Sequence, residues 1–428
     1  MTGRAGAPNV TVAILNRGRR AELRRLIVAL GQQRFRDFAV VLVSDAPTAA
    51  ALELGEAGRR LSFQHLAEAN VARARNLALA HATGDIIAFC DDDAVPEPGW
   101  LAALIAPFED PKVGAAGGFV RGRNGVSFQW RGTAFDRTGT DSPLPLSADG
   151  PVALFPPEAG RFVKTVGTNA AFRVAALRAI GGFDEAYAFF LDETDANLRL
   201  SEAGWWTAVV PGAEVHHSFA ASAQRAADRV PRTLCQTAFS KGYFLARHAP
   251  TSTHGEAMEA FRQSTRRQVH RAFALGLLAP SQVRPLLDEV ARGLEEGRLA
   301  PEHSTPALGM SAENGLHFAT SAREAPRIAV LAEPWGLAEA RDRAAALAAE
   351  GAETTLLAFR PSLRPLTVRF DPAGYWLHQG GIWGRTERTE WRIRLDTLRN
   401  RWRMELSRIA AQRMFTTILG SDGRECVP

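Results

Sequence analysis

Apolar residues between positions 10 and 220 follow two alternating patterns. Short apolar runs such as "VTVAIL" and "FAVVLVSD" predict strands, and "AELRRLIVAL" between them places Leu23, Leu26, Ile27 and Leu30 on one helical face. The alternation continues with the helical pattern "VARARNLALAHA" and the strand patterns "DIIAFC" and "VGAAGGFV". Strands that alternate with crossover helices predict an α/β fold with a doubly wound, mostly parallel sheet.

The pattern changes twice further along the chain. It predicts a helical extension over residues 223–300, a linker rich in Pro, Gly, Ser and Thr over 301–325, and a small α/β unit over 326–428. The first domain then covers residues 1–222. The opening "PRIAVLAEPWGLAEARDRAAALAAEGAETTLLAF" of the last unit has a strand, helix and strand pattern.

The tail of the chain has a local excess of positive charge. Between Arg385 and Arg413 there are nine arginines and four acids, an excess equal to the net charge of +5. A single helical stripe is predicted from Trp391, Leu395, Leu398, Trp402, Leu406 and Ile409. We expect a basic amphipathic helix packed on its own domain, with contact to a membrane surface or a partner protein as the alternative.

The overall composition limits the class of protein. Apolar residues make up 46% and charged residues 23% of the 428 positions, as in an ordinary soluble protein. The sequence shows neither the ~20-residue apolar run of a membrane helix nor the features of a signal peptide, which predicts a cytoplasmic location, with peripheral attachment at the inner membrane face as the alternative. The three scattered cysteines suggest neither disulfides nor zinc ligands. The absence of a long basic groove with aromatics argues against nucleic acid as a substrate.

Polar residues gather where three predicted strands end. These are Asn16–Arg17, Ser44–Asp45 and the run Asp91–Asp93. Ligands of open α/β sheets bind beyond the carboxyl ends of strands. Three adjacent carboxylates repel one another, so they need water or a cation to neutralise them. The run is therefore either a solvated turn or a divalent metal site.

A second acidic group begins a helical pattern in "LDETDANLRL", at Asp192, Glu193 and Asp195. Stabilisation of the helix N-terminus explains one or two of these acids. It does not explain the aromatic residues nearby, Phe189–Phe190 and Trp205–Trp206, which suggest a walled cleft.

Together these segments resemble the inverting family-two glycosyltransferases, which have the GT-A fold. The matching motifs lie within residues 8–220 and are "ILNR", "LVSD", "ARNLALAHATGDIIAFCDDD", "VGTNAAFR", "GGFDEAYAFFLDETDANLRLSEAG" and "VPGAEVHH". The resemblance implies a metal-dependent, hexosyltransferase-type enzyme that moves a sugar from a nucleotide-sugar donor to a glycan or lipid-linked acceptor, as in surface polysaccharide synthesis. The implied cofactor is Mn²⁺ or Mg²⁺.

The resemblance also implies roles for individual residues. Metal ligands would be Asp93, Asp91 and His217, or its neighbour His216, although a structural histidine pair is an equal alternative. Donor-binding residues would be Asn16, Arg17, Asp45, Arg75, Asn76, Asp91 and Asp92. Glu193 falls on the position of the catalytic base, and Asp192 is the second candidate because the usual Glu-Asp order is reversed here. Acceptor-side residues would be Thr168, Asn169 and Trp205.

Two other functions compete with this interpretation. A nucleotidyltransferase would normally carry a glycine-rich phosphate loop in the first turn, whereas "LNRGRRAEL" has one glycine. A non-catalytic binding module would be expected to lack some of the acids. The C-terminal unit resembles the first part of a Rossmann-like glycosyltransferase half, and a docking or oligomerisation role is expected for it.

Overall fold

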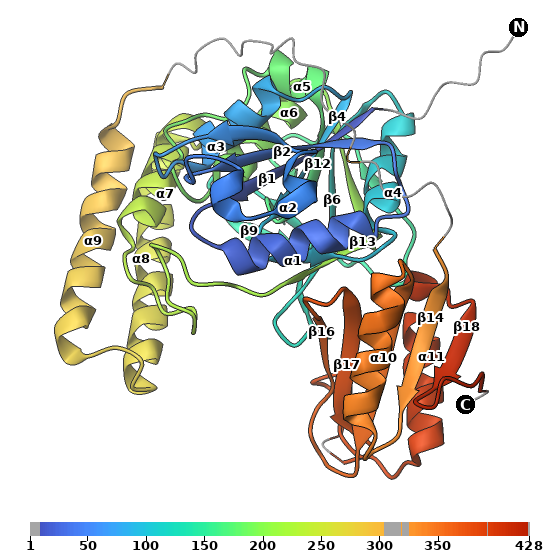
Figure 1. Cartoon of the computed structure of the whole chain (residues 1–428). Coiled ribbons are helices and arrows are strands. Elements are labelled where there is room, and N and C mark those ends of the chain that lie inside the picture. The colour runs from blue at the N-terminus through green and yellow to red at the C-terminus, as the bar shows by residue number, and fades with distance from the viewer. Residues whose placement is uncertain (1–8, 304–317, 319–324, 392, 427–428) are drawn as a thin grey trace, which may run out of the picture.

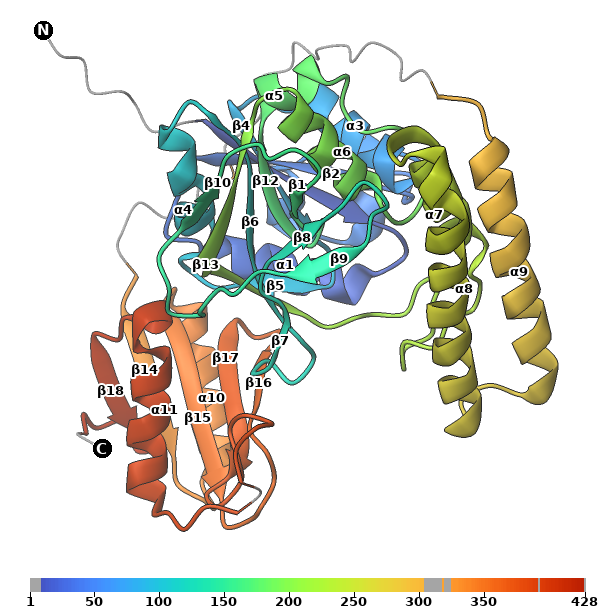
Figure 2. The same ribbon diagram turned by 180° about the vertical axis from the view of Figure 1, so that it is seen from behind.

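The computed structural model describes residues 9–303, 318, 325–391 and 393–426. Figures 1 and 2 show the central sheet with its helices, a helical hairpin on one side, and the C-terminal α/β unit on the other. Most of the predicted linker 301–325 lies outside the described residues. No described helix is long and apolar enough to span a membrane.

The central sheet has the order β10-β13-β6-β12-β4-β1-β2-β3, with β5 paired to β13 and β7 to β6. Its strands are β1 (Val10–Asn16), β2 (Phe38–Ser44), β3 (Ser62–His65), β4 (Ile86–Asp91), β5 (Ala94–Pro96), β6 (Val113–Arg121), β7 (Phe128–Trp130), β10 (Ala153–Phe155), β12 (Asn169–Arg173) and β13 (Trp206–His217). Strands β3, β2, β1 and β4 run parallel. Strand β12 is antiparallel between β4 and β6, and β6 and β13 are again parallel. The predicted α/β fold of the GT-A type is confirmed.

Helices cover both faces of this sheet because its central strands are apolar on both sides. They are α1 (Arg20–Gly31), α2 (Gly55–Gly58), α3 (Val71–Ala80), α4 (Trp100–Ile105), α5 (Val174–Ala179) and α6 (Asp192–Glu202). Helices α1 and α4 contribute to the core on one face, and α3, α5 and α6 to the core on the other. The four apolar residues predicted for one face of α1 are all buried. A small sheet of β8 (Thr133–Phe135), β9 (Asp141–Pro143) and β11 (Phe162–Lys164) lies apart from the main one.

The helical segment consists of α7 (Cys235–His248), α8 (Thr251–Ala274) and α9 (Pro280–Leu299). Tyr243 and Phe244 of α7 join an aromatic core with Phe135, Tyr187 and Leu198 of the first domain. Helix α7 thus packs directly against the part of the first domain that contains α6, as Figure 2 shows.

The C-terminal unit has a sheet of order β16-β17-β15-β14-β18, parallel except for β16. Its elements are β14 (Arg327–Ala332), α10 (Leu337–Ala349), β15 (Glu353–Arg360), β16 (Thr367–Phe370), β17 (Tyr375–Gly381), α11 (Leu398–Arg413) and β18 (Thr417–Gly420). Helix α10 packs on one face of the sheet and α11 on the other.

The predicted C-terminal stripe is only partly correct. Helix α11 begins at Leu398, because the Thr397 side chain caps it by accepting a hydrogen bond from the backbone N–H of Asn400. Trp391 and Leu395 lie outside the helix and are 89% and 99% exposed. The expected basic face is also incomplete, since Arg413 is buried.

The C-terminal unit shares a hydrophobic core with the first domain. Ala29, Val95 and Val126 belong to the same cluster as Trp376 and Leu406. The turn between β6 and β7 sits on β16, where the Val368 N–H donates to the Asn124 carbonyl at 2.8 Å. Gly125 allows this approach, since it has φ +68° and any Cβ would collide with the Val368 backbone.

Candidate active site

Strand pairing brings the aspartate run and the histidine pair together. Asp91 ends β4, and Asp93 immediately precedes β5. Strand β5 pairs antiparallel with the end of β13, in a register that sets Ala94 opposite His217. Two segments far apart in the sequence therefore place Asp93 and His217 side by side at the carboxyl edge of the sheet.

Asp91, Asp93 and His217 form a cluster whose possible ligand atoms all lie within 4.8 Å of one another. The His217 Nε2 faces Asp93 Oδ1 at 3.2 Å, and this nitrogen is buried without a well-formed hydrogen bond. Its Nδ1 lies 3.1 Å from Gln129 Oε1, which fixes the ring orientation. Asp91 accepts a hydrogen bond from the Thr168 hydroxyl at 2.6 Å. Two carboxylates and an oriented imidazole with an unpartnered nitrogen fit a divalent cation.

Asp93 is held in its charged form. Burial alone would raise its pKa, but His217, Arg19 and the backbone N–H of Ala220 outweigh burial, and the pKa lies well below the usual range. Arg19 Nη1 lies 3.2 Å from Asp93 Oδ2. A charged carboxylate at this position is what a cation site requires.

Asp92 lies outside this cluster and is held by groups of the protein, so its donor-binding role remains a prediction. Its side chain is fully buried, with Arg19 at 2.7 Å and the Asn16 amide donating at 2.7 Å. Burial raises the pKa of Asp92 to about 8. The Asn16 amide oxygen accepts from Ser44 while its nitrogen donates to Asp92, and Asn16 also lines the cavity at the ends of β1 and β2.

A cavity of about 400 Å³ opens beside the carboxyl ends of β1 and β2. Arg17 and Asp45 line it, together with Phe189 and the segment 221–224. The Gly18 N–H donates to Asp45 at 3.1 Å, and Arg17 Nε lies 3.8 Å from the same carboxylate. The structure therefore places three of the predicted donor residues, Asn16, Arg17 and Asp45, in one cavity together with the Arg19 that contacts Asp93.

Arg75 joins the two acidic groups. Its guanidinium lies 2.5 Å from Asp192 and 3.7 Å from Glu193, and the charge of Asp91 also acts on it. A Cβ at Gly167 would collide with this guanidinium, so the glycine makes room for it. Arg75 is buried, and its ion-pair contacts are with carboxylates of the protein.

Asp192 and Glu193 differ in exposure and in protonation. Their side chains are 3% and 18% exposed. Burial raises the pKa of Asp192 well above its usual range, whereas Arg75 and the hydrogen bond from Asp192 hold the pKa of Glu193 below its usual range in spite of burial. Glu193 is therefore the more exposed of the two carboxyl groups and the one whose pKa is lowered.

The turn that leads into α6 is strained. Phe190 and Leu191 have φ of 74° and 67°, in the left-handed region that non-glycine residues seldom adopt. Each residue held in this backbone conformation lowers the stability of the fold by on the order of 1–3 kcal/mol, and such residues concentrate at functional sites. The turn sets the first residues of α6, including Glu193, toward the edge of the sheet.

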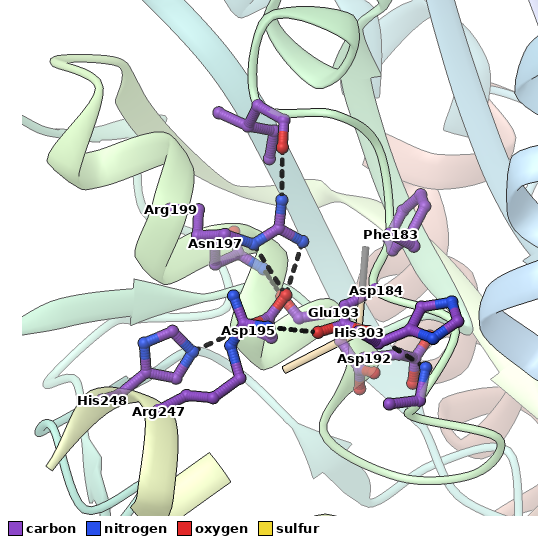
Figure 3. A network of polar contacts seen from close by, with 12 residues as sticks. Phe183, Asp184, Asp192, Glu193, Asp195, Asn197, Arg199, Arg247, His248 and His303 are labelled. Carbon is purple, nitrogen blue, oxygen red and sulfur yellow. Dashed lines mark hydrogen bonds and ion pairs between the residues drawn. The ribbon is translucent and has the colours of Figure 1, made fainter. Parts of the chain in front are cut away.

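A polar network holds α6 against α7, as Figure 3 shows. Asp195 is fully buried, with Arg199 Nε donating to it at 2.8 Å and His248 Nε2 at 2.7 Å. Asp184 accepts from Tyr243 and Arg247 of α7 at 3.0 and 2.8 Å. The helical segment therefore supports the helix that carries Glu193.

Three further predicted site residues lie elsewhere. Asn76 holds the loop before α6, donating to the Phe183 carbonyl at 2.8 Å and accepting from the same residue's N–H. Asn169 is fully buried and bonded to Trp100 and two backbone carbonyls. Trp205 packs on Gly114 just before the start of β13, at the end of the strand opposite to His217. The contacts of these three residues are structural, and their binding roles remain predictions.

Sequence reasoning missed two residues that shape the site. Arg19 bridges Asp92 and Asp93, and its only signal was the basic run after the first strand. Glu97 lies just beyond β5 and accepts from His216 at 2.8 Å, so it holds the histidine next to His217. A single glutamate in "VPEPGW" gives no signal for such a contact.

Comparison with known proteins agrees with this geometry. Residues 10–181 match the model of Glycosyl transferase family 2. The chain is 31% identical over 218 residues to the pre-mycofactocin glycosyltransferase of Mycobacterium tuberculosis, covering 49% of this chain and 42% of that protein. It is 43% identical over 53 residues to the N-acetylglucosaminyl-diphospho-decaprenol L-rhamnosyltransferase of the same species, covering 12% of this chain and 17% of that protein. The chain thus spans less than half the length of these relatives.

Among solved structures, a Pyrobaculum calidifontis mannosyltransferase in complex with GDP-Man and Mn²⁺ aligns with a TM-score of 0.42 and 19% identity, over 68% of this chain and 88% of that one. GalNAc-T7 with UDP, GalNAc and Mn²⁺ aligns with a TM-score of 0.42 and 14% identity, over 50% and 44%. The family match covers residues 10–181, which include Asp91 and Asp93.

Proposed function

We propose that the chain transfers a sugar from a nucleotide-diphosphate donor to a hydroxyl of a glycan or glycolipid acceptor, with inversion at the anomeric carbon. The observation that carries this proposal is the cluster of Asp91, Asp93 and His217, on the same sheet edge as the cavity at Arg17 and Asp45. A carboxylate cluster, a cavity for a nucleoside and an ionised Glu193 are the parts that such a transfer needs.

In this proposal the nucleoside occupies the cavity near Asp45, and the diphosphate lies toward Asp91 and Asp93. A divalent cation, Mn²⁺ or Mg²⁺, bound by these residues and His217 would neutralise charge on the departing nucleoside diphosphate. Arg19 keeps Asp93 ionised and in place.

Glu193 accepts the proton of the acceptor hydroxyl as its oxygen forms the bond to the anomeric carbon. The bond from that carbon to the diphosphate breaks on the opposite side, which gives inversion. Asp192 is buried against Arg75 and its pKa is raised, which favours Glu193 as the proton acceptor. Thr168 orients Asp91 and so acts through it.

A screen of nucleotide sugars tests the proposal without knowledge of the acceptor. We expect at least one donor to raise the melting temperature and to be hydrolysed slowly, in both cases only with Mn²⁺ or Mg²⁺ present. If no nucleotide sugar stabilises the protein or is hydrolysed with either metal, the proposed function is wrong.

A further inference from the structure

A second cavity, of about 600 Å³, lies where the C-terminal unit meets the first domain. Its lining comes from α1, the turn between β6 and β7, the end of β13, α10 and the segment around β16. In Figure 1 helix α1 lies directly over β16 and α10, and Figure 2 shows the turn before β7 reaching β16. The cavity is therefore formed by the docking of the two parts, and neither part encloses it alone.

The charged lining of this cavity is strongly unbalanced. Four arginines line it, Arg25, Arg123, Arg341 and Arg369, and they come from four different elements. The only carboxylate among the lining residues that the structure describes is Asp371. Such a concentration of positive charge in a concave site attracts anions.

These arginines are not neutralised by the protein. Arg25, Arg341 and Arg369 form no ion pair with a carboxylate in the described part of the chain, and the Nε of Arg25 is buried without a hydrogen-bond partner there. Arg123 is held by the carbonyls of Ser218 and Phe219 at 3.1 and 3.0 Å, which leaves its charge unpaired. By contrast, Arg24 on the same helix as Arg25 is paired with Glu53.

The position of this cavity relative to the metal cluster is also informative. His217 lines it, while the Nε2 of the same ring faces Asp93. The donor cavity is lined by Arg19, which contacts the other carboxylate oxygen of Asp93. The two cavities share no lining residue. The four arginines are thus available to a ligand other than the donor nucleoside.

We propose that this cavity binds a phosphate- or diphosphate-bearing ligand, at a site separate from the donor cavity. Guanidinium groups match phosphate oxygens in charge and in bidentate geometry. Asp371 lies at the same cavity, but its Oδ1 is occupied by the Ala373 N–H at 3.0 Å. The inference does not depend on the proposed sugar transfer.

Calorimetry of inorganic pyrophosphate binding to the full chain in EDTA tests this site. Without a metal the carboxylate cluster repels the anion, so binding reports the arginine cavity. We expect saturable, salt-sensitive binding that weakens at least tenfold in the double variant Arg25→Gln/Arg369→Gln. The matched control is Arg20→Gln/Arg364→Gln, which removes the same charge from the same regions but outside the cavity, and should keep the wild-type affinity.

Two outcomes would overturn the proposal: no binding of pyrophosphate, or equal affinities in the cavity variant and the control variant. Competition then separates the sources of the phosphate. Displacement by a hexose 1-phosphate or a short prenyl diphosphate supports a site for a phosphate ester. Displacement by inorganic phosphate alone supports a site for the free anion. The nucleotide-sugar screen requires a metal, whereas the pyrophosphate titration excludes it. A negative result in one experiment therefore does not contradict the proposal that the other experiment tests.

Discussion

Glu97 and Arg413 form a buried ion pair across 316 residues of sequence, with both carboxylate oxygens at 2.8–2.9 Å from the guanidinium. The same carboxylate accepts from His216, whose ring lies 4.7 Å from that of Trp376 in the C-terminal unit. Glu97 follows β5 and His216 precedes His217, so the last helix of the chain braces the strand pair that carries Asp93 and His217. The C-terminal unit is therefore part of the support of the site.

Removal of Arg413 should destabilise the whole protein. Arg413→Met leaves Glu97 buried without its guanidinium partner, and breaking one side of a buried ion pair costs about 3–5 kcal/mol. The free energy of unfolding from urea denaturation measures this. Arg399→Met, an exposed position on the same helix, should change it by less than about 0.5 kcal/mol.

The pair can also be tested by its coupling. Glu97→Gln/Arg413→Met should recover part of the stability lost in Arg413→Met, because no buried charge is then left alone. Equal stability of Arg413→Met and wild type would contradict the bracing role. For the same reason, a chain cut before residue 326 should lose stability, and we do not expect it to behave as an intact donor-binding module.

Acid should weaken this contact in a defined range of pH. Burial raises the pKa of Glu97, but Arg413 and His216 outweigh it and lower the pKa from 4.5 to about 2. A lowered pKa in the folded state means that the stabilisation is present above about pH 4.5 and is lost as pH falls toward 2. Glu97→Gln should show a smaller loss of unfolding free energy across that range than wild type. An identical pH dependence in both proteins would exclude this contribution.

The sheet and half of the site could be predicted from sequence, because both depend on local patterns. Short continuous apolar runs predicted the strands, and the aspartate run that follows one of them places Asp91 and Asp93 at the carboxyl edge of the sheet. His217 was predicted only through the family resemblance. Local patterns cannot show which group a polar side chain will contact. Asn76 and Asn169 were therefore expected at the cleft, whereas their side-chain amides donate hydrogen bonds to backbone carbonyls.

The remaining errors have similar physical causes. The apolar stripe from Trp391 was predicted as helix because its spacing fits a helical face. Thr397 is the N-cap residue, however, so the helix begins only at Leu398. The Glu97–Arg413 contact joins two lone charges in distant elements, and no pattern in either segment indicates the other.

The proton acceptor can be identified by paired variants. Glu193→Gln keeps the size of the side chain but cannot take a proton, so transfer should fall by roughly 10²- to 10⁴-fold while donor affinity is retained. Asp192→Asn replaces a buried carboxyl whose pKa is raised, so it should lower kcat less. Both are measured as kcat and as donor Kd by calorimetry. A nearly inactive Asp192→Asn beside an active Glu193→Gln would assign the role to Asp192.

Asn76 should behave as a scaffold residue. Asn76→Ala removes hydrogen bonds to both backbone groups of Phe183 and leaves buried groups unsatisfied, which costs about 1–3 kcal/mol in unfolding free energy. Donor affinity at a temperature where the variant is folded should stay within about twofold of wild type. A large loss of affinity without a loss of stability would restore the donor-binding role predicted from sequence.

The cluster of Asp91, Asp93 and His217 is the centre of this account, and nucleotide binding tests it most directly. Calorimetry with the nucleoside diphosphate of the best donor should show binding with Mn²⁺ or Mg²⁺ that is lost or at least tenfold weaker in EDTA. Asp93→Asn should reduce the metal-dependent affinity to a similar degree, while Asp45→Asn should weaken binding without removing its dependence on metal. Equal affinity of the wild-type chain for the nucleotide with EDTA and with metal would contradict the assignment of this cluster as a metal site.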